Sequence, residues 1–93
     1  MQTIFVVDDN LTNLATAKKT LQDQYRVMNL PSADKMFALI EKVTPDLILL
    51  DIEMPGMDGF EALQILKANA KLADIPVIFL TSMTDSKVEA RGF

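Results

Sequence analysis

Three apolar runs of this 93-residue chain end on side chains that could do chemistry. The runs are IFVVDD, LILLD and VIFLTS, and the polar residues at their ends are Asp8, Asp9, Asp51, Thr81 and Ser82. A carboxylate at the end of a buried strand is costly to desolvate, so its presence there needs a reason. The chain contains no histidine and no cysteine, which excludes imidazole and thiolate chemistry. Carboxylates, hydroxyls, amines and the backbone are the groups that remain.

The acids would repel one another if the fold brought them together. Two unit charges about 4 Å apart cost roughly 4 kcal/mol at an effective dielectric constant near 20. A bound cation, or a proton on one of the acids, relieves this repulsion. Oxygen ligands without imidazole or thiolate favour Mg²⁺ or Mn²⁺ over zinc. Because Mg²⁺ also takes ligands from phosphate oxygens, and a carboxylate is the best nucleophile available, the pattern indicates phosphoryl chemistry.

Each acid also has a purely structural interpretation. An Asp directly after a strand often caps the helix that follows, which applies to Asp8 or to Asp9 taken alone. Asn10 occupies the better cap position, which weakens this interpretation. A turn follows Asp51, so the structural alternative for Asp51 is a side chain that accepts hydrogen bonds from the backbone amides of that turn.

The elements that must position these residues alternate along the chain. The expected strands occupy residues 3–7, 25–30, 47–50 and 76–80. The expected helices follow cap residues Asn10, Ser32 (residues 33–43) and Asp58, and a fourth begins near Thr84 or Asp85. Alternation of strands and helices predicts an α/β fold with a doubly wound parallel sheet. In such a sheet the carboxyl ends of the strands share one edge, so the polar residues that follow them should converge.

Composition limits the other classes of function. The formal net charge is −4 and no Lys/Arg stripe is present, which argues against direct nucleic-acid binding. The apolar runs are far shorter than the roughly 18 residues that a membrane span needs. The absence of cysteine makes a cytoplasmic location the default expectation. The length suggests one domain over residues 1–93.

The segments IFVVDDN, LILLDIEMPGMDGFE and IPVIFLTS resemble the receiver domain of two-component response regulators, in order and spacing along the whole chain. The resemblance implies a flavodoxin-like receiver fold with strand order 2-1-3-4. It also implies a phosphoacceptor in a phosphorelay, which takes a phosphoryl group from a sensor histidine kinase or a phosphotransfer protein with Mg²⁺ or Mn²⁺ as cofactor.

The resemblance assigns roles to four acidic residues. Asp51 would be the phosphoacceptor and a metal ligand. Asp9 would bind the metal directly, and Asp8 mainly through water. Glu53 would offer its backbone carbonyl to the metal and its side chain to tuning hydrolysis.

The resemblance also assigns roles to two hydroxyl residues, and the sequence differs from the family pattern after the fourth helix. Thr81 would be the switch hydroxyl that bonds the phosphoryl group, and Ser82 would donate a backbone N–H. In the family, a fifth strand ends in a lysine that pairs with the phosphoryl oxygens, and a fifth helix follows. This sequence ends at Phe93, and neither Lys71 nor Lys87 stands at that place. We therefore expect a receiver fold that lacks its last strand and helix.

This departure leads to a prediction about assembly. Without a fifth strand, strand four would be an unpaired apolar sheet edge, which invites pairing with another chain. We expect a homodimer or a swapped assembly around strand four or helix four.

Two alternative functions stay open beside the phosphoacceptor. A receiver-like fragment without the lysine-bearing segment could act only as an assembly or interaction module. A magnesium-dependent aspartyl-phosphate phosphatase or transferase would need a second Asp, as general acid, two residues after the nucleophile, where this chain has Glu53. The resemblance implies an autocatalytic phosphoacceptor at most, and not an enzyme with an external substrate.

Overall fold

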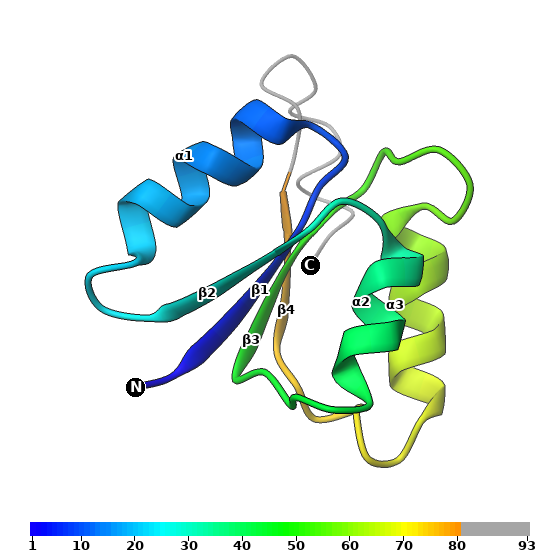
Figure 1. Cartoon of the computed structure of the whole chain (residues 1–93). Helices are drawn as coiled ribbons and strands as arrows, with labels where there is room; N and C mark the ends of the chain where they lie inside the picture. The colour runs from blue at the N-terminus through cyan, green and yellow to red at the C-terminus, as the bar shows by residue number, and fades with distance from the viewer. Residues whose placement is uncertain (81–93) are drawn as a thin grey trace.

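Four strands and three helices alternate along residues 1–80, the part of the chain that the computed structural model describes (Figure 1). The strands are β1 (Thr3–Val7), β2 (Arg26–Leu30), β3 (Leu47–Asp51) and β4 (Val77–Leu80). The helices are α1 (Leu11–Leu21), α2 (Ala33–Ile40) and α3 (Gly59–Ala68). The strands form where apolar residues run together, and the helices form where apolar residues recur at helical spacing.

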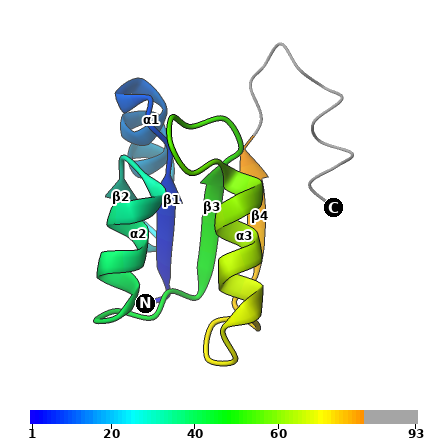
Figure 2. The same ribbon diagram turned by 90° about the vertical axis from the view of Figure 1, so that its right-hand side faces the viewer.

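All neighbouring strands pair in parallel, in the order β2-β1-β3-β4. Ile4 of β1 pairs with Val27 on one side and with Leu47 on the other. The predicted α/β class, parallel sheet and strand order 2-1-3-4 are confirmed. Because the strands run in one direction, their carboxyl ends lie at the same edge of the sheet, where the strand arrows end in Figure 2.

The sheet separates two apolar layers. Helix α1 lies on one face, whereas α2 and α3 lie on the other (Figures 1 and 2). All five residues of β1 are buried, as expected for a strand covered on both faces. Phe5 of β1 packs into the layer that contains Met36 and Leu66, and Val6 packs into the layer that contains Leu14. Successive side chains of β1 thus pack on opposite faces of the sheet, and this packing holds in place the strand that precedes Asp8 and Asp9.

Each helix starts at the cap residue predicted from the sequence. The Asn10 side chain accepts hydrogen bonds from the backbone N–H groups of residues 12 and 13. Ser32 caps α2 in the same way. Asp58 and Glu61 form a capping box at the start of α3. These side chains satisfy N–H groups that the first turn of a helix leaves without a partner.

Several element boundaries differ from the prediction. Helix α2 ends at Ile40, short of residue 43, because Lys42 and Val43 both donate to the carbonyl of Leu39 in a closing turn. Strand β3 extends one residue further than predicted and includes Asp51, which pairs with Leu80 of β4. Strands β2 and β4 each begin one residue later than predicted. The helix expected near Thr84 or Asp85 lies outside the described residues.

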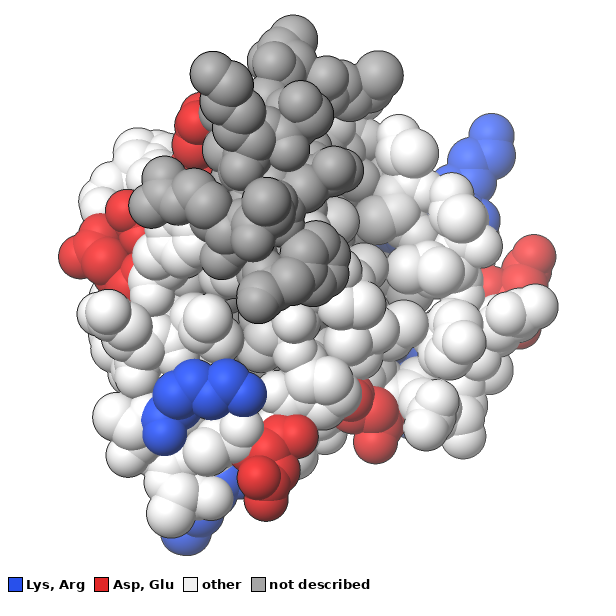
Figure 3. Space-filling model, turned by 180° about the vertical axis from the view of Figure 1, so that it is seen from behind, with Lys and Arg blue, Asp and Glu red and all other residues white. Residues whose placement is uncertain are grey.

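Charged side chains are dispersed on the face shown in Figure 3. In the visible, described part of that face, the Lys and Arg side chains stand in separate places and form no continuous basic patch, and the Asp and Glu side chains likewise stand in separate places. None of the helices in residues 1–80 has the length and apolar character that a membrane crossing requires.

Candidate functional site

Three acidic side chains converge at the carboxyl edge of the sheet. Asp8 and Asp9 follow β1, and Asp51 is the last residue of β3, the strand beside it. One carboxylate oxygen from each residue lies within 4.8 Å of the others. Asp8 is 2% exposed, Asp51 is half-buried and Asp9 is exposed. The convergence expected from the strand ends is therefore present.

Asp8 is held by two donors from the start of α1. Its Oδ1 accepts the backbone N–H of Asn10 at 2.9 Å, and its Oδ2 accepts the side-chain Nδ2 of Asn13 at 3.0 Å. The backbone N–H of Asp8 donates to the carbonyl of Leu30 at 3.1 Å. The cap of α1 is Asn10, so helix capping does not account for Asp8 or Asp9.

The surroundings of Asp51 disfavour its ionised form. Burial raises the pKa of Asp51 to about 7, and the charge of Asp8, its hydrogen bond to Asp51 and the charge of Asp9 act in the same direction. The backbone N–H of Glu53 donates to Oδ1 of Asp51 at 3.3 Å and lowers the pKa. The hydrogen bond from a turn amide, which the structural interpretation of Asp51 predicted, is thus present. The net shift in the pKa of Asp51 is nevertheless upward, because burial and the neighbouring acids outweigh this hydrogen bond.

Gly59 sets the distance between α3 and the end of β3. Its N–H donates to the carbonyl of Ile52 at 2.8 Å. A Cβ atom on Gly59 would lie 2.5 Å from the backbone oxygen of Asp51 and 2.8 Å from Cα of Ile52. Only glycine allows this approach, so the start of α3 packs directly against the backbone that carries Asp51. Gly56, at φ 81°, makes the tight turn of the intervening loop.

The donor set fits a hard divalent cation. Three carboxylate oxygens within 4.8 Å of one another can bind a small ion directly or through water. The ligands are all oxygen, which favours Mg²⁺ or Mn²⁺ over zinc. A cation here would also offset the charge repulsion that raises the pKa of Asp51.

A sequence model described as the response regulator receiver domain matches residues 4–93. The chain belongs to this family. The predicted family is thereby confirmed, and the fold agrees with it. The receiver domain is a module of two-component response regulators, and the three sequence segments quoted above predicted it.

Curated relatives of the receiver differ widely in length. A probable cyclic di-GMP phosphodiesterase of Vibrio cholerae is 37% identical over 91 residues, which cover 98% of this chain and 21% of that protein. Protein PilH of Pseudomonas aeruginosa is 34% identical over 83 residues, which cover 88% of this chain and 69% of PilH. Protein RcaC of Microchaete diplosiphon is 30% identical, and the chain spans 14% of its length. The shared part is the receiver, whatever else each relative contains.

Solved structures show the same receiver fold. The N-terminal domain of a response regulator receiver protein from Methanoculleus marisnigri superimposes with a TM-score of 0.87 at 35% identity, covering 98% of this chain and 75% of that one. Chemotaxis protein CheY4 of Vibrio cholerae gives a TM-score of 0.87 at 28% identity, covering 99% of this chain and 78% of that one.

The receiver fold brings together only part of the predicted site. Asp8, Asp9 and Asp51 form one cluster. Glu53 is exposed, and its backbone N–H reaches Asp51. Thr81 and Ser82 lie outside the described residues. The metal, phosphoryl and switch roles assigned to these residues stay predictions.

Sequence reasoning missed Asn13 and Gly59 as parts of this site. The signal available for Gly59 was its place directly after the Asp58 cap, close to the end of the loop from β3. The signal for Asn13 was weaker: an amide in the first turn of the helix that follows the paired acids.

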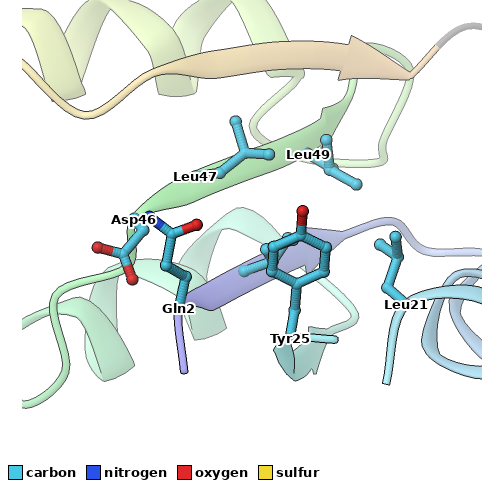
Figure 4. A pocket seen from close by; sticks show the side chains of 7 residues that line it. Gln2, Leu21, Tyr25, Asp46, Leu47 and Leu49 are labelled. Carbon is cyan, nitrogen blue, oxygen red and sulfur yellow. The ribbon is translucent and has the colours of Figure 1, made fainter. Parts of the chain in front are cut away.

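A pocket of about 300 Å³ lies near the amino ends of β1 and β3 (Figure 4), whereas the three acids lie at the carboxyl ends of these strands. Its lining comes from β1, β3 and the residues just before them, from the last residue of α1 and from the segment that follows it: Gln2, Ile4, Leu21, Tyr25, Asp46, Leu47 and Leu49. The Tyr25 hydroxyl points across it toward β3 in Figure 4. The pocket contains none of the three clustered acids, so it is separate from the candidate site.

Proposed function

We propose that this receiver domain is a phosphoacceptor of a two-component phosphorelay, which takes a phosphoryl group on Asp51 from a histidine kinase or a phosphotransfer protein in a Mg²⁺-dependent reaction. The observation that supports the proposal is the convergence of three carboxylates from β1 and β3 within 4.8 Å. Asp8, Asp9 and Asp51 would hold the cation, with the carbonyl of Glu53 as a further ligand. Mn²⁺ is the alternative cation, and the cytoplasm is the location that fits this partner.

The transfer step follows from the chemistry of Asp51. One carboxylate oxygen of Asp51 attacks phosphorus, an O–P bond forms, the P–N bond of the donor phosphohistidine breaks, and the imidazole nitrogen keeps the electron pair. Asp51 must be ionised to attack, whereas the metal-free cluster raises its pKa to about 7. A bound Mg²⁺ supplies positive charge that offsets both the acids and the phosphoryl oxygens. Asp8 and Asp9 would hold that charge beside Asp51, and the proximity of the three carboxylates within 4.8 Å supports this role.

Residues after β4 supply the remaining proposed groups. Leu80, the last residue of β4, pairs with Asp51, so Thr81 follows the acceptor's direct neighbour in the sheet. We assign the phosphoryl-binding hydroxyl to Thr81 and a phosphoryl-binding backbone N–H to Ser82 on this position in the chain. The side chain of Glu53 would tune hydrolysis of the acyl phosphate.

Intact-mass measurement tests the proposal. Incubation with acetyl phosphate and Mg²⁺ should add one phosphoryl group to the wild-type chain and none to Asp51→Ala. Asp23→Ala, which removes an exposed acid that is not among the clustered acids, should take up the group like the wild type. Absence of uptake by a wild-type chain with a normal circular dichroism spectrum would contradict the proposal and favour the interaction-module alternative. Turnover of an added phosphomonoester would favour the phosphatase alternative instead.

A further inference from the structure

Asn13 contacts the acid cluster from a position that the proposed function does not use. It lies in the first turn of α1, and its Nδ2 donates to Oδ2 of Asp8 at 3.0 Å. Asp8 is the buried member of the cluster, with 2% of its surface exposed. The hydrogen bond therefore connects the helix to the acid that has the least access to water.

We propose that Asn13 is a positioning residue of the cation site. Its amide holds the carboxylate of Asp8 in the orientation in which Asp8, Asp9 and Asp51 share one divalent cation. The inference rests on the proposed function, because it gives Asn13 a role toward the cation that the function requires.

Two donors, one on each oxygen, fix the plane of the Asp8 carboxylate. The backbone N–H of Asn10 bonds Oδ1, and the side chain of Asn13 bonds Oδ2. Each carboxylate oxygen has two acceptor lone pairs, so each keeps one for the cluster. Removal of the Asn13 amide leaves one donor, which restrains the side chain but permits the carboxylate to rotate.

The chemical type of the side chain at position 13 suits this role. A neutral amide stabilises an ionised carboxylate by donating a hydrogen bond. A Lys or Arg at the same place would also donate, but its charge would compete with the divalent cation. An Asp would have the same shape with no donor, and it would add a fourth negative charge beside the three acids.

Asn10 offers a control that separates helix stability from acid positioning. The side chain of Asn10 caps α1 by accepting the N–H groups of Thr12 and Asn13 at 2.9 and 3.1 Å. Its backbone N–H, which any residue except proline keeps, makes the bond to Asp8. Asn10→Ala thus weakens the helix and spares the Asp8 contact, whereas Asn13→Ala removes the Asp8 contact and spares the cap.

Calorimetric titration of the whole chain with Mg²⁺ provides the test. Loss of a hydrogen-bond partner of a metal ligand typically weakens metal affinity about 10- to 100-fold, so Asn13→Ala should raise the Mg²⁺ dissociation constant by about 10-fold or more. Asn10→Ala should lower the melting temperature and leave the dissociation constant near the wild-type value. Asn13→Leu, which keeps the branched arrangement of four side-chain heavy atoms and favours the helix, should behave like Asn13→Ala and serves if the alanine variant does not fold.

A kinetic readout distinguishes positioning from chemistry. In phosphoryl uptake from acetyl phosphate, Asn13→Ala should need more Mg²⁺ for half-maximal rate but approach the wild-type rate at saturating Mg²⁺. An unchanged dissociation constant in both Asn13 variants, or an equal loss of affinity in Asn10→Ala, would overturn the inference. If the wild type binds Mg²⁺ and is modified on Asp51 while the Asn13 variants are unchanged, only this inference fails. If the wild type binds no Mg²⁺, the inference and the proposed function both fail.

Discussion

Asp51 shows how the neighbours of a residue decide its chemistry. Its carboxyl group is half-buried, and two further acids lie beside it within 4.8 Å. The pKa of Asp51 is raised from 3.8 to about 7, first by burial and then by the charge of Asp8. The same acids that prepare a cation site therefore destabilise the ionised acceptor when no cation is bound.

This conflict predicts the pH dependence of stability in the metal-free protein. Between pH 3.8 and about 7, Asp51 keeps its proton in the folded state and loses it in the unfolded state. The folded state then binds more protons, so the free energy of unfolding should fall as pH rises through this window. Allowing for solvent screening of this partly exposed group, we expect a loss of about 1–2 kcal/mol.

Urea unfolding in EDTA at a series of pH values measures this effect. Asp51→Asn introduces a neutral side chain of the same shape. The variant should lack the decrease in the free energy of unfolding that Asp51 causes between pH 3.8 and about 7, and it should be more stable than the wild type at neutral pH. A variant with the same pH slope as the wild type would show that another group is responsible.

At the scale of secondary-structure elements, the junction between β3 and α3 places the acceptor. The N–H of Gly59 bonds the carbonyl of Ile52, and no space exists between Gly59 and the backbone of Asp51 for a Cβ atom. The capping box of Asp58 and Glu61 starts the helix at this point. A small change at the helix start is therefore transmitted to the end of the strand.

Gly59→Ala should displace the acceptor. The added methyl group would lie 2.5 Å from the backbone oxygen of Asp51, so the helix or the strand must shift. We expect destabilisation of about 1–3 kcal/mol and slower phosphoryl uptake from acetyl phosphate. Denaturant unfolding and intact-mass time courses measure the two effects.

Gly56→Ala is the matched control. A methyl group added at Gly56 would have no atom within 4 Å, but the φ of +81° at this position makes the substitution strained. The variant should lose about 1–2 kcal/mol of stability through backbone strain, with little change in the uptake rate of the folded protein. Equal slowing in both variants would mean that general loss of stability, and not displacement of Asp51, is the cause.

At the scale of the whole molecule, the two faces of the sheet are covered unequally in the described part of the chain. Helices α2 and α3 pack on one face, and α1 alone packs on the other, over β1 and β2 (Figure 1). On the α1 side, Leu47, Leu49 and Leu80 are only partly buried, and Ile78 is 43% exposed. Strand β4 is also an edge strand among the four described.

This arrangement makes the predicted homodimer or swapped assembly around strand four a proposal that can be tested. Sedimentation velocity at micromolar concentration should show a species larger than the monomer. Ile78→Lys places a charge on the exposed position of β4 and should shift the protein to monomer, because edge strands with charged side chains resist pairing. A wild-type protein that sediments only as a monomer would contradict the proposal.

The sequence was sufficient to predict the acid cluster because its determinants are local and periodic. The strand-length apolar runs ending at Asp8 and Asp51, and the caps at Asn10, Ser32 and Asp58, each depend on neighbouring residues. Parallel pairing then places the carboxyl ends of adjacent strands together, whatever the details of packing. The strand order and the family followed from the same segments.

Only the tertiary structure decided which residues support the acids. The bond from Asn13 to Asp8 depends on the direction in which α1 leaves β1, and the contact between Gly59 and Asp51 depends on how closely α3 approaches β3. Both are set by packing of whole helices on the sheet, which the local pattern of residues does not specify. The raised pKa of Asp51 has the same origin, since burial and three-dimensional proximity to Asp8 produce it.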